Sequence, residues 1–241
     1  MFQSEFSERL FEFFYNHEFL NTYDVHIYVP SQNREGLSGY DAKLKGRKTK
    51  AILLQFKIVN QYERAPHLYT SPAFKFELLK HKVKGYRQHN QLFKIGKKGL
   101  LALYVVPPFV DYKTLYTKSY KSKLLLDCNY YYPTHKIVDN KYHYVTFDSS
   151  NADLHSKESR SLRSLTGEDF LGVLTNSQFE DWQITISKLN DLSLEYYNQI
   201  IDDYSNLEYK SQENFSLDKQ SKIRINNYMA ENHLVLLSFI E

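Results

Sequence analysis

Two apolar segments constrain the fold of this chain more than any other feature. Residues 51–59, AILLQFKIV, and residues 100–106, LLALYVV, each have the length and hydrophobicity of a strand in the interior of a sheet. The first segment contains Gln55 and Lys57, which share a face because side chains alternate between the faces of a strand. An amide and an ammonium on one face indicate either a solvated face of the sheet or part of an active site.

The segments around these two runs predict a helix, three strands, a helix and a strand, in that order. Apolar residues recur at helical spacing in the helices, and polar and apolar residues alternate in the first strand. A tight turn around Gly46 joins the second strand to the third. The predicted elements are a helix at 3–20, strands at 24–29, 40–45 and 50–59, a helix at 73–93 and a strand at 100–106. The first helix has an apolar stripe formed by Phe2, Phe6, Leu10 and Phe13.

The rest of the chain is predicted to add strands and then to become mainly helical. The signals are strand patterns within 120–133 and 141–147, helix starts at Thr166-x-x-Asp169 and Ser177-x-x-Glu180, an apolar helical stripe from 178 to about 205 and a helix after Ser216. We therefore expect two parts. Residues 1–165 form an α/β (α+β) domain with a mixed sheet flanked by helices, and residues 166–241 form a mainly helical C-terminal extension packed on it.

The composition indicates a globular protein of the cytoplasm. Of 241 residues, 42% are hydrophobic and 24% are charged, close to the average for soluble domains. There is no run of 18 apolar residues, so neither a transmembrane helix nor a membrane partner is expected. The first residues include acids and lack the basic start of a secretory signal. The single cysteine, Cys128, permits no internal disulfide.

The charge distribution suggests a polyanionic partner. Residues 43–98 contain 15 Lys or Arg and only two acids, whereas the remainder contains 16 basic residues and 26 acids. A basic block beside an acidic remainder is typical of proteins that bind nucleic acid. The alternative is that these lysines only solvate the outer faces of strands and a helix.

Three polar side chains converge if the strands at 40–45 and 50–59 form a hairpin. With the turn near Arg47 and Lys48, Asp41 lies across the hairpin from residues 54 and 55, on the same side as Gln55 and Lys57. Carboxylate and amide oxygens are ligands suited to Mg²⁺. A neighbouring ammonium can orient the attacking water or stabilise developing negative charge.

This arrangement resembles the PD-(D/E)XK nuclease superfamily, and most closely its Mrr-like branches in which Gln replaces the acid. The stretches GYDA, LLQFK, QHNQL and LYVVPPF are also similar to an uncharacterised bacterial branch, and the resemblance covers residues 1 to about 110. It implies a restriction-endonuclease-like core of order α-β-β-β-α-β. It also implies that Asp41, Gln55 and the carbonyl of Phe56 bind Mg²⁺ or Mn²⁺ and that Lys57 assists the water.

The superfamily commonly adds a glutamate from the first helix, and several residues match that position. Helical phase favours Glu5, which flanks the apolar stripe, over Glu8 and Glu12, which point more toward solvent. Glu35, shortly before Asp41 in the chain, is a further candidate. Because Gln55 carries no charge, the helix glutamate would have to compensate for a missing carboxylate.

Context distinguishes this site from chance matches. The pattern D/E/Q-x-K occurs six times in the chain, but only Gln55–Lys57 lies in an apolar strand between an aspartate-bearing strand and a basic helix. His135, His143 and His155 do not have the spacing of a helical metal site. The sequence contains no P-loop, no dinucleotide fingerprint and no Gly-x-Ser-x-Gly elbow.

The basic residues around the candidate site are the expected contacts to nucleic acid. They lie at the hairpin and on the following helix, where the resemblance also implies a role for a glutamine. These residues are Lys43, Lys45, Arg47, Lys48, Lys80, Lys84, Arg87, Gln88, Gln91 and Lys94.

The sequence thus predicts a metal-dependent nuclease that cleaves DNA, as a homodimer or with a partner protein bound through the C-terminal helices. A role in defence against foreign DNA follows from the habits of the superfamily. Two alternatives remain: a catalytically inactive nucleic-acid-binding protein with a nuclease-like fold, and an interaction subunit of a larger complex.

Overall fold

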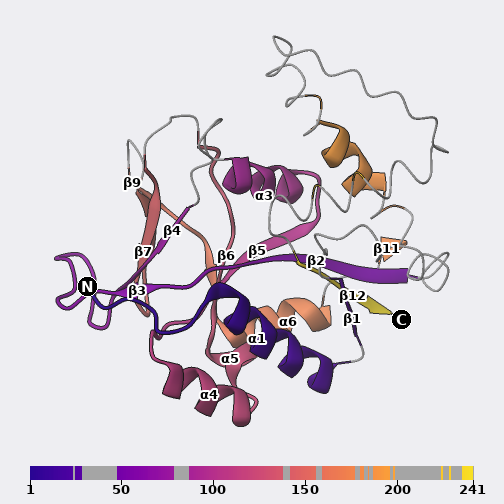
Figure 1. The fold of residues 1–241 in the computed structure, drawn as a ribbon. Coiled ribbons are helices and arrows are strands. Elements are labelled where there is room, and N and C mark those ends of the chain that lie inside the picture. Colours follow the sequence, from indigo (N-terminus) through magenta and orange to yellow (C-terminus); the bar gives the residue numbers. More distant parts are fainter. Residues whose placement is uncertain are drawn as a thin grey trace, which may run out of the picture.

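The computed structural model shows a mixed α and β fold with two sheets (Figure 1). One sheet carries helices on both faces, and the other lies beside it. The structure describes residues 1–23, 25–28, 48–78, 87–137, 142–155, 159–176, 180–181, 184, 187–195, 198, 224, 228 and 235–240. Of the predicted strands, the one at 40–45 lies outside the described residues.

The larger sheet contains the two apolar segments as neighbouring parallel strands. Its order is β1-β12-β2-β5-β6-β10, with β11 also paired to β2. β2 and β5 are parallel, with Leu54 opposite Leu103, and the other pairs are antiparallel. The strands are β1 (Val25–Tyr28), β2 (Lys48–Phe56), β5 (Leu101–Val106), β6 (Asn129–Tyr131), β10 (Ser164–Leu165), β11 (Glu180–Asp181) and β12 (Val235–Ile240). The predictions of strands at 24–29, 50–59 and 100–106 are therefore confirmed.

β12 corrects the prediction for the end of the chain. Residues 235–240 form a strand between β1 and β2, where Val235 lies opposite Leu54 and Ile240 opposite Thr49. The sequence predicts a mainly helical extension from 166 onward, but the sheet contains residues from both sides of that boundary. A run such as VLLSFI is apolar enough for a buried strand or a buried helix, and only its neighbours in space decide between them.

The smaller sheet corrects the start of the second predicted helix. Its antiparallel strands are β3 (Asn60–Gln61), β4 (Phe74–Glu77), β7 (Tyr144–Phe147), β8 (Ala152–His155) and β9 (Ser159–Ser161), in that order. Residues 74–77 were expected to be helical, but Phe74 and Phe76 are buried while the intervening residue and Glu77 are not. This period of two is the pattern of a strand with one buried face.

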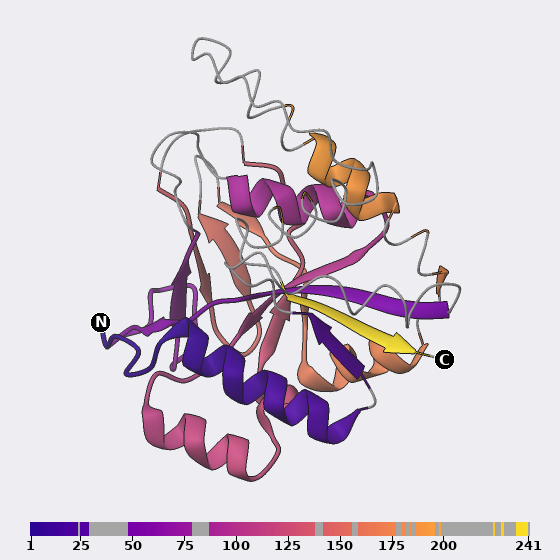
Figure 2. The same ribbon diagram turned by 45° about the vertical axis from the view of Figure 1, so that its right-hand side comes forward.

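The helices cover the two faces of the larger sheet (Figures 1 and 2). One core contains residues of α3 together with Leu53 and Tyr104. The core on the other face combines residues of α1, α5 and α6 and Leu115 of α4 with Leu54 and Phe56 of β2. The labelled helices are α1 (Glu8–Thr22), α3 (Arg87–Lys97), α4 (Tyr112–Tyr120), α5 (Leu124–Asp127) and α6 (Gly167–Asn176). α3 thus lies opposite α1, α4, α5 and α6, whereas the helical residues 187–195 lie on the α3 side, since Leu189 and Leu192 belong to the same core.

The first helix starts later than predicted and packs through a different stripe. Ser7 caps α1 by accepting a hydrogen bond from the Leu10 N–H at 3.2 Å. Phe11, Tyr15 and Phe19 are fully buried, whereas Phe2 and Phe13 of the predicted stripe are exposed. Since residues 1–7 are not helical, spacing counted from Phe2 does not give the phase of α1.

Of the remaining local predictions, for helix starts and strands after residue 120, some are confirmed and others are wrong. Thr166 and Asp169 form a reciprocal capping box at the start of α6, with both backbone hydrogen bonds at 3.1 Å. Glu180, expected in the first turn of a helix, instead pairs with Thr49 as part of β11. Strand 141–147 is confirmed by β7, whereas segment 120–133 contains both α5 and β6.

None of the helices in the described residues has the length and apolar character needed to cross a bilayer.

The central position of β12 gives a first prediction. Deleting residues 235–241 removes the strand that joins β1 to β2, so we expect loss of the cooperative thermal transition in circular dichroism. Deleting Glu241 alone, which lies beyond the end of β12, is the control and leaves the transition intact. A truncated protein that melts like the full chain would contradict the placement of β12.

Candidate active site

The two polar residues of the central strand lie at its carboxyl end and are buried. Gln55 has no exposed surface and Lys57 is 3% exposed, so neither belongs to a solvated face of the sheet. The Lys57 N–H donates to the Val105 carbonyl at 3.0 Å, which extends the contact of β2 with β5 by one residue. The solvated-face reading of these residues is therefore wrong.

The neighbours of the strand place Gln55 on the side of α3. Leu53 belongs to the core with α3, whereas Leu54 and Phe56 belong to the core with α1. Alternation along β2 therefore directs Gln55 toward the α3 side. Its cross-strand neighbour Tyr104 is in the same core.

Lys57 follows the end of β2, where a long side chain can reach past the edge of the sheet. Its Nζ lies 3.7 Å from Oε2 of Glu8, the first residue of α1. Burial lowers the pKa of Lys57, and the Glu8 carboxylate partly opposes that shift. The helix glutamate that the structure brings to this lysine is thus Glu8, which sequence phase had placed toward solvent.

Glu8 reaches Lys57 because the buried side of α1, which packs on the sheet, begins close to Glu8. It precedes Phe11 by three residues and Tyr15 by seven, so it extends the packed side of the helix. Those two rings contact Phe56 edge-on, at centroid distances of 5.7 and 5.1 Å. Burial and the Glu8 charge one turn away raise the pKa of Glu12.

Glu5 has a different partner. It precedes α1, and its carboxylate accepts a hydrogen bond from the Tyr112 N–H at 2.9 Å, at the start of α4. A carboxylate at a helix N-terminus stabilises the unpaired N–H groups there. Glu5 is exposed, and its observed contact is with α4 rather than with Lys57.

The strand expected at 40–45 is not among the partners of β2 that the structure describes, which are β5, β11 and β12. The sequence predicts direct pairing of 40–45 with the third strand, but residues 49–54 of β2 pair with β12 on one side. On the other side, residues 52–56 pair with β5. Asp41 itself, like Glu35, lies outside the described residues.

The oxygen donors at the carboxyl end of β2 are of the types that bind a hard divalent cation. Because Lys57 N–H points to β5, the Phe56 carbonyl points to the opposite side, where the described pairing of β12 ends at Leu54. This carbonyl and the Glu8 carboxylate are the types of ligand that Mg²⁺ uses. Within the described ranges, no three His, Cys, Asp or Glu side chains lie close enough to form a metal site. A magnesium site would therefore need a carboxylate such as Asp41.

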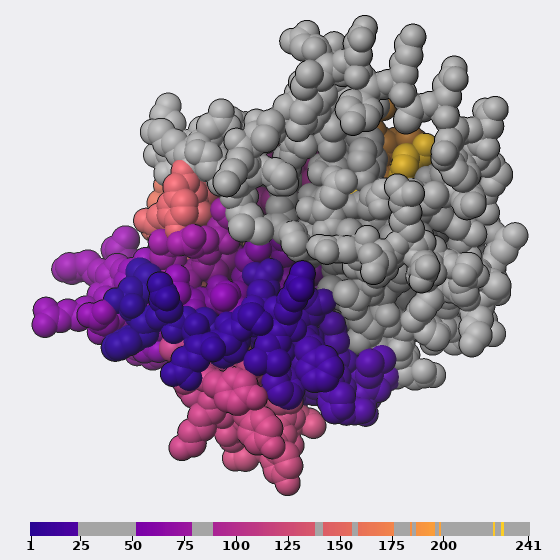
Figure 3. Space-filling view, in the orientation of Figure 1, coloured from indigo at the N-terminus to yellow at the C-terminus, as the bar shows by residue number. Residues whose placement is uncertain are grey.

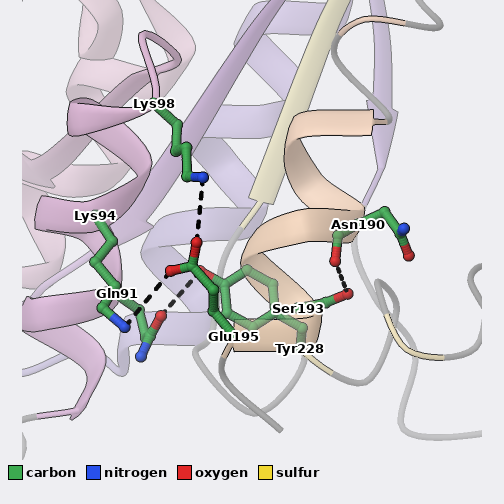
Figure 4. A network of polar contacts seen from close by, with 7 residues as sticks. All are labelled: Gln91, Lys94, Lys98, Asn190, Ser193, Glu195 and Tyr228. Carbon is green, nitrogen blue, oxygen red and sulfur yellow. Dashed lines mark hydrogen bonds and ion pairs between the residues drawn. The ribbon is translucent and has the colours of Figure 1, made fainter. Parts of the chain in front are cut away.

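α3 carries two of the expected nucleic-acid contacts in described positions. Gln91 is 3% exposed, and Tyr228 donates to its Oε1 at 3.4 Å, so this glutamine supports the core rather than a surface. Lys94 Nζ lies 3.9 Å from the Glu195 carboxylate, which also contacts Lys98 Nζ at 3.1 Å (Figure 4). Burial lowers the pKa of Lys94, and the nearby Lys98 adds to that shift.

The other expected contacts are not described in full. Lys48 starts β2, at the end of the strand opposite to Lys57, and Arg87 and Gln88 start α3. The side chains of these three residues lie outside the description. The same holds for the whole of Lys43, Lys45, Arg47, Lys80 and Lys84.

His89 is a buried polar residue that the sequence did not single out. Its Nε2 donates to the His135 carbonyl at 2.6 Å, so Nδ1 accepts from the Tyr104 hydroxyl at 2.9 Å. Burial lowers the pKa of His89 to about 4, and the imidazole is therefore neutral near pH 7. No sequence pattern around His89, which lies two residues before Gln91 in a basic helix, indicates that its side chain is buried and hydrogen-bonded.

Comparison with known proteins does not extend the resemblance. No protein-family model, curated protein or solved structure matches the chain. The function must therefore be argued from the residues themselves.

The buried lysine gives a pH prediction. In the folded protein the pKa of Lys57 is lowered from its ordinary value of 10.5. At pH values between the folded-state and the unfolded-state pKa, the unfolded chain therefore binds more protons, and the free energy of unfolding rises with pH. Lys57→Met lacks this contribution. We expect the stability difference, wild type minus Lys57→Met, to increase as the pH is raised toward 10, in urea denaturation measured at a series of pH values. A difference independent of pH would show that the ammonium is solvated.

Proposed function

We propose that the chain is a metal-dependent nuclease that hydrolyses phosphodiester bonds in DNA. The observation that carries the proposal is the buried Lys57 beside Glu8 at the carboxyl end of β2, next to Gln55. A buried cation with a carboxylate partner and a lowered pKa is more typical of a functional site than of a solvated surface. The resemblance to the PD-(D/E)XK superfamily supports the same reading.

In this proposal Lys57 and Glu8 have separate tasks. Lys57 orients the attacking water and stabilises negative charge on the phosphate, and its lowered pKa makes it a better proton donor. Glu8 holds the lysine in position and, with Asp41 and the Phe56 carbonyl, supplies oxygen ligands. Bound Mg²⁺ or Mn²⁺ would lower the pKa of a water molecule and neutralise charge on the phosphate. Glu5, whose carboxylate caps α4, has no part in this set.

Finer parts of the proposal rest on the sequence. They comprise a restriction-endonuclease-like core, DNA as the substrate, a homodimer or a partner protein, a role in defence and a cytoplasmic location. In support of the core, α1 and α3 lie on opposite faces of the sheet, and β2 and β5 are parallel with α3 between them in the chain. The basic block of residues 43–98 supports a nucleic-acid partner.

A second candidate is an inactive nucleic-acid-binding protein on the same fold. The observation that favours it is the position of β12, which occupies the side of β2 where the aspartate-bearing strand was expected. The described part of β12 contains no carboxylate, since its sequence is VLLSFI. The two candidates differ in whether Asp41 reaches the end of β2.

Cleavage assays separate the two candidates. We expect the full chain with Mg²⁺ or Mn²⁺ to cut plasmid DNA, and Lys57→Met or Asp41→Ala to lower the rate by roughly 10²- to 10⁴-fold, as for loss of a proton-transferring or charge-stabilising group. Glu8→Gln should lower it as well, because Lys57 loses its counter-charge. Product formation is followed on gels.

A matched control is Glu168→Gln, an exposed acid on α6 that should cut like the wild type. Binding of the same DNA without metal is measured in parallel. Wild-type protein that binds with a steep salt dependence but never cuts would sink the nuclease proposal in favour of the binding protein. Absence of both binding and cutting would leave only the interaction subunit.

The Glu195 contact makes a separate prediction about binding. Its carboxylate lies between Lys94 and the more exposed Lys98, where it competes with a phosphate for the Lys98 ammonium (Figure 4). We expect Glu195→Gln to increase affinity for DNA by roughly two- to fivefold at low salt, the value of a partly exposed ion pair. Glu168→Gln changes net charge equally and should have a smaller effect. Equal affinities, measured by fluorescence anisotropy, would show that α3 does not contact DNA.

A further inference from the structure

α4 exposes a row of tyrosines at one-turn spacing. Tyr112, Tyr116 and Tyr120 are 46, 56 and 82% exposed, and the last two are among the most exposed aromatic residues that the structure describes. Residues four apart lie on one side of a helix, about 6 Å apart along the axis. In the space-filling view the pink residues that include α4 project from the molecule below α1 (Figure 3).

A second row runs beside the tyrosines. Lys113, Thr117 and Lys121 each follow one of the tyrosines directly in sequence, so they are also four residues apart and form a parallel row. All three are exposed. The outward side of α4 thus presents aromatic rings along one line and two ammonium groups along the next.

The acids near α4 are engaged in holding the helix. Asp111 accepts from the Thr114 N–H at 2.7 Å, and Glu5 accepts from the first N–H of the helix. Asp127 pairs with Lys118 at 2.6 Å, on the inner side. The helix itself contains no acid, and Leu115 anchors it in the core. These contacts fix α4 while leaving its outward side positive.

We propose that this outward side of α4 binds single-stranded nucleic acid. Unpaired bases stack on exposed aromatic rings, and the adjoining lysines contact the phosphates, a combination that does not require a particular base sequence. A protein partner fits less well, because the centres of protein interfaces are depleted of lysine. Tyrosine rather than leucine or phenylalanine gives each ring a polar tip that tolerates water when unbound.

This inference rests on the proposed role in nucleic-acid metabolism and names the form of the substrate. It does not depend on cleavage. α4 is joined to the start of α1 through Glu5, three residues before Glu8. A nucleic-acid strand bound along α4 therefore lies next to the start of α1, the helix that carries Glu8 of the candidate active site.

Binding without metal tests the platform. The full chain is titrated in EDTA against fluorescein-labelled oligo(dT) and against a duplex of the same length, with anisotropy as the readout. We expect tighter binding of oligo(dT), and a loss of roughly tenfold for Tyr116→Ala/Tyr120→Ala, from lost base stacking. Lys113→Ala/Lys121→Ala should reduce the salt dependence by about 1.4 in log–log slope, or two phosphate contacts on a single strand.

Two controls separate stacking from unfolding. Tyr116→Phe/Tyr120→Phe keeps the rings and should bind like the wild type. Tyr142→Ala removes a tyrosine that is 46% exposed but lies beside β4, with its hydroxyl bonded to Glu77, and should bind normally.

Unchanged oligo(dT) affinity in the alanine double variant overturns the platform alone. Tyrosine variants that break a dimer in size-exclusion chromatography, without affecting oligo(dT), identify a self-association surface instead. A wild type that binds no nucleic acid in EDTA overturns this inference, and the proposed function falls with it only if the protein also fails to cut DNA with Mg²⁺ or Mn²⁺.

Discussion

The structure depends on the pairing of β2 along both of its edges. β12 covers residues 49–54 on one side and β5 covers residues 52–56 on the other, so neighbouring strands hold β2 along both edges. Its two faces then separate two cores, one under α1 and one under α3. A strand enclosed in this way has no room for a solvated polar face. Lys57 is therefore buried at the strand end, and its charge is balanced by Glu8 rather than by water.

This enclosure links the fold to the candidate chemistry. Desolvation lowers the pKa of Lys57, and α1 supplies the carboxylate that limits the shift. The helix that supplies it is held against β2 by Phe11 and Tyr15, which contact Phe56. The residue between Gln55 and Lys57 thus anchors the helix that carries Glu8. Packing and the candidate site use consecutive residues of one strand, so a change in the α1 contact would also move the carboxylate.

Sequence patterns predicted elements correctly where local signals were sufficient. The apolar runs of β2 and β5 and the Thr166 capping box needed no knowledge of distant residues. Predictions failed where two readings had similar local patterns. Phe74 and Phe76 suit a helix or a strand, and a sheet partner made them a strand. The phase of α1 depended on its start at Glu8, and that start depends on the Ser7 cap. An error there chose Glu5 over Glu8.

The sequence by itself determined that Gln55 and Lys57 lie at an apolar strand and that a second apolar strand follows later in the chain. It also determined the charge asymmetry that points to a polyanion. Only the tertiary structure decided which glutamate meets the lysine and which strand lies beside β2, because both depend on contacts between residues far apart in the chain. Lys57 meets a residue 49 positions earlier, and Leu54 pairs with Val235. No local pattern encodes such partners, since burial and pairing are satisfied only when the whole sheet has formed.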